Sequence, residues 1–260
     1  MNQSEKAKRF TELHVKGRPV LLYNAWDAGS AKAILAAGAH AIATSSYSIA
    51  EAQGYRDGEA IPIALAEQIV GRIAATTDAP VTVDFEGGYS EGDDELAGNI
   101  ARLLDLGVIG INFEDRVVKS SGLYDIARQA ERIAIIRDTA KERGMNLFIN
   151  ARTDVFFEYG EDAAHAVPEA LERAKAYATA GASGLFVPGL TDAKRIGRIV
   201  EGSTLPVNVM IMDGVPSNDR LAELGVARIS YGPIPYIRAM ETLGQEAKTV
   251  LSAGAKRSGG

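Results

Sequence analysis

Short apolar runs alternate with longer helical patterns along this chain, and the alternation constrains the fold more than any other feature of the sequence. Parallel strands are joined by crossovers that are usually helices, so regular alternation predicts a parallel sheet. The runs are short and mostly apolar, which is typical of strands buried on both sides. We expect strands at residues 20–25, 41–46, 81–86, 110–115, 147–153, 184–189, 207–210 and 227–231.

Glycines mark the ends of the helical patterns between these strands. Amphipathic spacing predicts helices at residues 94–106 and 126–143. A glycine adopts the left-handed conformation that ends a helix at little cost. The repeating unit of helix and strand therefore fits a closed (β/α)8 barrel of the TIM type, which usually has about 250 residues. The glycines are Gly38, Gly107, Gly144, Gly181 and Gly225.

One α/β domain over residues 1–260, with a C-terminal helical segment at about 233–255, accounts for the whole sequence. No linker rich in Pro, Gly or Ser divides the sequence. A doubly wound open sheet is the alternative, but no GxGxxG motif follows the first predicted strand to support it.

The composition excludes several classes of function. The sequence has no cysteine, which excludes disulfides, thiolate chemistry and zinc–sulfur sites. Its net charge is -6 and it has no basic block, so we expect no nucleic-acid partner. No apolar run approaches the roughly 20 residues that span a membrane, and the N-terminus lacks the apolar core of a signal peptide. We expect a cytoplasmic enzyme without a membrane partner.

Acidic side chains cluster where two neighbouring predicted strands end. Asp84 and Glu86 are two residues apart and therefore point to the same face, and Glu114 ends the next strand. In β/α barrels the chemistry lies at these carboxyl ends. Hard oxygen ligands without Cys or a nearby His favour Mg²⁺, with Mn²⁺ as a second choice. The alternative is that Arg152 and Arg116 form salt bridges with the acids.

Other side chains at strand ends are candidates for binding a small carboxylate substrate. Arg152 is the first, because its planar fork matches a carboxylate. Ser45 and Ser46 can donate hydrogen bonds to the substrate, but they can equally cap the end of the strand. Tyr23 and Asn208 lie in the first and seventh predicted strands towards the site, and we include them in the substrate site.

Five ordered motifs resemble the isocitrate lyase and phosphoenolpyruvate mutase superfamily, especially proteins similar to carboxyvinyl-carboxyphosphonate phosphorylmutase. The resemblance covers residues 15–235. It implies a modified barrel whose last helix is exchanged between subunits of a homodimer or homotetramer. It also implies Mg²⁺-dependent chemistry on an α-oxo acid or its enolate. The motifs are NAWDAGSAKAILAAGAHAIATSS, QGYRDGE, VTVDFEGGYS, GINFEDR and NARTDVF.

The resemblance also implies unequal roles for the site residues. Asp84 matches the direct metal ligand, whereas Glu86 and Glu114 match acids that bind metal-coordinated water. Asp57 matches an acid near the metal on a mobile segment, and we include it among the catalytic residues. Ser45, Ser46 and Arg152 match the groups that bind the carboxylate and oxo end of the substrate.

The sequence departs from the superfamily in the segment after the fourth predicted strand. The isocitrate and methylisocitrate lyases have a KKCGH loop, where this sequence reads RVVKSSGLYD, and a Glu where this sequence has Gly189. Both differences argue against those two activities. Phosphonate-handling members tend to have a Lys-x-Asn-Ser loop; here Lys119, Ser120 and Ser121 keep the Lys and one Ser but no Asn. Lys119 is a candidate acid or anion contact; its alternative is a solvated loop lysine.

We therefore expect a lyase that breaks a C–C bond, or a decarboxylase, acting on an α-oxo acid or substituted malate through an enolate. The first alternative is C–P chemistry on a substrate similar to phosphonopyruvate. The second alternative is a degenerate enzyme that binds a small acid without converting it.

Overall fold

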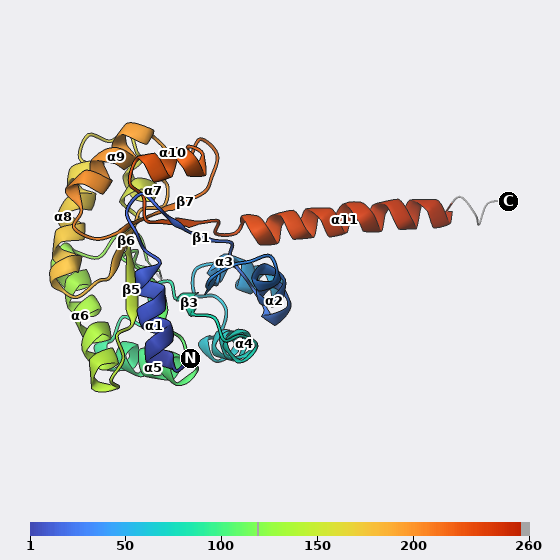
Figure 1. Cartoon of the computed structure of the whole chain (residues 1–260), viewed down its shortest axis with the longest axis horizontal. Helices are drawn as coiled ribbons and strands as arrows, with labels where there is room; N and C mark the ends of the chain where they lie inside the picture. Colours follow the sequence, from blue (N-terminus) through green and yellow to red (C-terminus); the bar gives the residue numbers. More distant parts are fainter. Residues whose placement is uncertain (119, 256–260) are drawn as a thin grey trace.

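The computed structural model describes residues 1–118 and 120–255 and shows a β/α barrel (Figure 1). Its sheet has eight strands in the order β1-β8-β7-β6-β5-β4-β3-β2, and all neighbouring pairs are parallel. The predicted fold class is therefore confirmed. The strands are β1 (Val20–Leu22), β2 (Ile42–Ala43), β3 (Val81–Asp84), β4 (Gly110–Glu114), β5 (Phe148–Arg152), β6 (Gly184–Phe186), β7 (Val207–Met210) and β8 (Arg228–Ser230).

The barrel closes weakly between its first two strands. β1 and β2 share no ladder, and a single parallel bridge between Ala25 and Thr44 joins the segments that follow them. Most strands end earlier than predicted, because the chain turns out of the sheet at the site. After β3, for example, Glu86 has a positive φ of 49° and begins a turn.

The helices cover the outside of the barrel and each of the five glycines marked in the sequence has a positive φ. The two helices predicted in detail are confirmed to within one residue at each end. The helices are α1 (Gln3–Glu12), α2 (Ala28–Ala36), α3 (Ser46–Ala52), α4 (Ile63–Ala75), α5 (Asp93–Asp105), α6 (Ile126–Glu142), α7 (Val155–Tyr159), α8 (Ala166–Thr179), α9 (Ala193–Gly202), α10 (Asn218–Glu223) and α11 (Ile234–Ala255).

Aromatic residues close the end of the barrel that is opposite to the predicted site. Phe10 on α1 is fully buried and packs edge-to-face on Phe148 at the start of β5. His14 stacks on Phe148 with ring centroids 4.1 Å apart. Above these rings the barrel interior becomes polar, since Asn112, Arg228 and their neighbours on adjacent strands are buried there.

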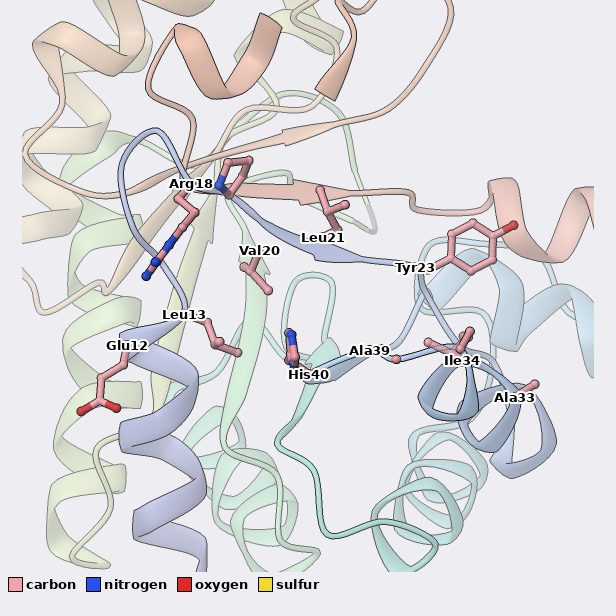
Figure 2. A pocket seen from close by; sticks show the side chains of 13 residues that line it. Glu12, Leu13, Arg18, Val20, Leu21, Tyr23, Ala33, Ile34, Ala39 and His40 are labelled. Atoms are coloured by element: carbon pink, nitrogen blue, oxygen red, sulfur yellow. The ribbon is translucent and has the colours of Figure 1, made fainter. Parts of the chain in front are cut away.

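The last helix, α11, extends away from the barrel and does not cover β8 (Figure 1). It exposes large apolar side chains, of which Leu243 is 58% exposed. On the barrel itself, an apolar groove of about 780 Å³ lies between α1, β1 and α2 (Figure 2). Val20, Leu21 and Ile34 line this groove. The fold thus leaves one apolar helix and one apolar groove without contact to each other.

Within the described residues, no helix combines the length and the apolar character needed to cross a membrane.

Candidate metal and substrate site

A polar cavity of about 310 Å³ lies at the carboxyl ends of the strands, where the sequence predicts the site. Three acids and two arginines contribute to its wall, so it suits a small charged ligand better than an apolar one. The lining residues are Ser46, Asp57, Gly58, Glu86, Glu114, Arg116, Val118 and Arg152.

Asp84 ends β3 beside this cavity, and hydrogen bonds fix both of its carboxylate oxygens. Oδ2 accepts the Ser46 hydroxyl at 2.8 Å and the Ser46 backbone N–H at 3.2 Å. Ser46 is the first residue of α3, where backbone N–H groups have no partner within the helix. Oδ1 accepts the Asn112 side-chain amide at 3.2 Å. The orientation of Asp84 is therefore set by α3 and β4 together.

Glu86 follows in the turn after β3 and contacts a second loop. Its carboxylate accepts the Glu59 backbone N–H at 2.7 Å and the Tyr89 hydroxyl at 3.2 Å. Glu59 in turn accepts the Tyr89 backbone N–H at 2.7 Å. All three residues have a positive φ, an arrangement that costs energy in residues other than glycine and is concentrated at functional sites. These bonds bring the loop that carries Asp57 to the edge of the cavity.

Glu114 ends β4 and forms an ion pair with Arg152 of β5, with 2.9 Å between Oε2 and Nη1. Arg152 also donates to both oxygens of Asp154, at 2.6 and 2.8 Å. The salt-bridge alternative considered for Arg152 is thus present in the structure. A guanidinium has five N–H donors, and these contacts use three of them. Two donors remain for a ligand.

The acids raise each other's affinity for protons. Burial, followed by the charges of Asp57 and Asp84, raises the pKa of Glu86 to about 8. Burial also raises the pKa of Glu114 well above its usual range, although the Arg152 charge opposes this shift. The pKa of Asp57 is raised by burial and by the Asp84 charge. Such mutual repulsion is what a bound cation would relieve.

The donor set fits a hydrated Mg²⁺ ion. Among residues 1–118 and 120–255, no three His, Asp or Glu side chains converge as a complete set of direct metal ligands. Mg²⁺ keeps several waters and needs only one or two protein carboxylates. One direct ligand at Asp84, with more distant carboxylates acting through water, is compatible with the lack of three converging ligands among the described residues and with the hydration that Mg²⁺ prefers.

The segment after β4 folds over the cavity as a short hairpin. Arg116 and Leu123 form an antiparallel bridge, and the Val117 N–H donates to the Gly122 carbonyl at 3.0 Å. Val118 lies at the cavity wall, so close to the turn after β3 that a Cβ on Gly87 would come within 2.8 Å of it. The predicted catalytic Lys119 lies outside the described residues.

Three predicted substrate residues do not line this cavity. The Ser45 side chain caps α3 by accepting the Ser48 N–H, as in the capping alternative. Tyr23 is 40% exposed and lines the outer groove, which Figure 2 shows. Asn208 is buried inside the barrel, where its Oδ1 accepts the Ser230 hydroxyl. The structure brings together Ser46, Asp57, Asp84, Glu86, Glu114 and Arg152.

Sequence reasoning missed two residues that shape the site. Asp154 follows Arg152 by two residues, a spacing that could have suggested that the two pair. Glu59 belongs to the motif around Asp57, but its contact with the turn after β3 joins residues that are distant in sequence. Nothing in the local pattern predicts such a contact.

Comparisons with known proteins agree on one family. Residues 10–251 match the family model described as phosphoenolpyruvate phosphomutase. A solved protein of Burkholderia cenocepacia J2315, provisionally named a phosphonomutase, is 48% identical over 94% of this chain and 99% of that one, with a TM-score of 0.91. The 2-methylisocitrate lyase of Salmonella typhimurium is 27% identical over 96% of this chain and 86% of its own length. A phosphonopyruvate hydrolase solved with oxalate and Mg²⁺ is 18% identical over 98% of this chain and 88% of that one; its TM-score of 0.85 shows a shared fold.

Proposed function

Since this chain belongs to the phosphoenolpyruvate phosphomutase family, which it shares with lyases and mutases, we propose that it is a Mg²⁺-dependent lyase for an α-oxo acid or a substituted malate. The observation that carries the proposal is the cavity at the strand ends, where oriented acids face Arg152. Its volume of about 310 Å³ suits a small acid.

In this proposal Asp84 is the direct ligand of the metal, and Glu86 and Glu114 bind it through water. A bound Mg²⁺ would act as a Lewis acid and stabilise negative charge on the oxygens of an oxo acid. Hydrogen bonds already orient the Asp84 carboxylate, so little reorganisation is needed when a ligand binds.

We assign recognition of the substrate carboxylate to Arg152, because both donors of Ser46 already bind Asp84. Two N–H donors of Arg152 remain after its bonds to Glu114 and Asp154. The ion pairs hold the guanidinium at the cavity wall, so its donors are positioned before the substrate arrives. The same donors would stabilise the enolate charge left when the bond β to the oxo group breaks.

The hairpin formed around the bridge between Arg116 and Leu123 would exclude water from the enolate. Exclusion matters because the electron pair of the broken bond stays on the enolate carbon until a proton reaches it. We propose Lys119 or a water molecule near Asp57 as the proton donor. If Lys119 is the donor, its replacement by Ala should abolish turnover while a substrate analogue still binds.

C–P chemistry is the second candidate, since the 48% identical relative carries the name of a phosphonomutase. Both candidates need the same metal and carboxylate contacts, and they differ in the bond that breaks. We therefore propose a panel of oxaloacetate, 2-alkylmalates and phosphonopyruvate with Mg²⁺. A 2-oxo acid formed without phosphate would support the lyase, whereas phosphoenolpyruvate or inorganic phosphate formed from phosphonopyruvate would support C–P chemistry.

Two variants test the metal site independently of the substrate. Asp84→Ala should abolish Mn²⁺ binding in calorimetry, whereas Asp138→Ala on the exposed face of α6 should bind like the native chain. Native affinity in Asp84→Ala would contradict the metal assignment. If the native chain binds oxalate with Mg²⁺ but converts no member of the panel, this result would support the alternative of a degenerate enzyme that binds a small acid without converting it.

We also propose that two copies exchange α11. In a β/α barrel, the helix after each strand packs on the outside of the sheet. Here α11 extends away from β8, and the groove beside β1 remains open (Figures 1 and 2). The apolar side chains of α11, including Ile237, Met240 and Leu243, match the apolar lining of this groove. A second copy of the chain is the occupant we propose, in a homodimer or homotetramer.

A further inference from the structure

Arg228 on β8 is a charged side chain in the middle of the barrel. It is 1% exposed, and in the part of the chain that the structure describes no carboxylate forms an ion pair with it. Its Nη1 also has no hydrogen-bond partner among the described residues. An isolated buried charge is strongly unfavourable, so a charge that persists in such a place needs compensation nearby.

The hydrogen bonds of Arg228 lead towards the proposed metal site. Nη2 donates to Asn112 Oδ1 at 3.0 Å, and the Asn150 amide donates to the same oxygen at 2.9 Å. With two donors on its oxygen, the Asn112 amide must direct its NH₂ group the other way. That group donates to Asp84 Oδ1 at 3.2 Å. Arg228 and Asp84 are therefore the two ends of an ion pair with one amide between them.

The charge of Arg228 persists at neutral pH. Burial lowers the pKa of its guanidinium to about 9, and the Asp84 charge acts in the opposite direction. An amide between the two charges transmits their attraction, because its dipole is aligned with both ends. Water screens this attraction little on the Arg228 side, since Arg228 and Asn112 are both buried, whereas Asp84 is half-buried beside the cavity.

We infer that Arg228 is a built-in countercharge of the metal site, which offsets the charge of Asp84 through Asn112 and so weakens the binding of a divalent cation. This inference rests on the proposed metal site. Without a metal, the countercharge stabilises a cavity crowded with carboxylates. With a metal, the same positive charge repels the cation and favours its release.

The test separates the charge of Arg228 from its hydrogen bond. Arg228→Gln removes the charge but leaves a side-chain amide that can donate to Asn112, whereas Arg228→Lys keeps the charge. We expect the Kd for Mn²⁺, measured by calorimetry, to fall at least tenfold in Arg228→Gln and to change less than threefold in Arg228→Lys. An unchanged or higher Kd in Arg228→Gln would overturn the inference.

Arg137 on α6 supplies the matched control, because it is also a buried arginine and donates to the Gly181 carbonyl and the Ser183 hydroxyl. Arg137→Gln should lower stability without changing the Kd for Mn²⁺. If the native chain binds no Mn²⁺, the proposed metal site fails.

A double-mutant cycle on metal-free protein tests the pair without any metal. It combines Arg228→Gln with Asp84→Asn and uses urea unfolding. We expect a coupling of at least tenfold in the unfolding equilibrium constant. Additive effects would show that the two charges are independent and would overturn the inference.

Discussion

His14 should make the barrel sensitive to mild acid, and the structure allows the size of the effect to be calculated. Nδ1 lies 2.8 Å from the Phe10 carbonyl oxygen, which can only accept, so this nitrogen carries the proton. Nε2 is buried and has no hydrogen-bond partner among the described residues. Burial, reinforced by the Arg228 charge, lowers the pKa of His14 from 6.5 to about 3. The folded chain therefore keeps His14 neutral where the unfolded chain protonates it.

The sign of the effect follows from proton counting. Between pH 6.5 and about 3 the unfolded state binds more protons at His14, so the free energy of unfolding falls as the pH falls. Integrating these two pKa values gives a loss of about 2.5 kcal/mol between pH 7 and pH 4.5. Stability from this group is complete above pH 6.5 and is lost on acidification.

The measurement compares the native chain with His14→Phe by urea unfolding at several pH values in this range. Phenylalanine can keep the stacking on Phe148 but cannot titrate. Because other titrating groups are common to both proteins, the difference between the two unfolding free energies isolates His14. It should shift by about 2.5 kcal/mol in favour of the variant between pH 7 and 4.5. A difference that stays constant would refute the assignment of a buried neutral His14.

Three further substitutions test other parts of the structure. Tyr177→Phe removes a hydroxyl that donates to the buried Asp115 carboxylate at 2.8 Å, so the unfolding free energy should fall by about 2 kcal/mol, whereas the exposed Tyr159→Phe should change it little. Glu59→Ala should speed amide hydrogen exchange of residues 54–60 at least tenfold, because Tyr89 then loses its acceptor. Glu59→Gln keeps an accepting oxygen and should exchange like the native chain. Equal exchange rates in Glu59→Ala and the native chain would contradict a positioning role for Glu59. Leu243→Glu should weaken self-association in sedimentation equilibrium, while Leu243→Met should not, if α11 is exchanged between copies.

The sequence predicts the barrel because its signals are local. Helix periodicity, apolar strands and glycines at helix ends repeat in each unit, and the observed helix ends agree with them. The strand ends were predicted too long, because the turn at Glu86 depends on contacts with the distant Glu59 loop. The residues around Glu86 in the sequence therefore do not predict that contact.

The same distinction applies to the site. Alternation along one strand does not predict that Asp84 lies beside Ser46 of α3, but it could have shown that Tyr23 points outward. Leu22 and Asn24 are buried, so the residue between them faces the other side. The role of Arg228 could not be predicted, because its hydrogen bond from β8 to Asn112 on β4 crosses the interior of the barrel and exists only when the sheet closes.

Arg228 connects the two ends of the barrel interior, and this connection gives a prediction that needs neither metal nor substrate. Its positive charge faces Asp84 through Asn112 on one side and lowers the pKa of His14 on the other. Arg228→Gln should therefore raise the pKa of His14, measured by NMR from the ring Cε1 proton. Burial is the larger cause of the shift, so the value should stay below 6.5. An unchanged His14 pKa would mean that the Arg228 charge is already neutralised elsewhere, and the countercharge role would fail with it.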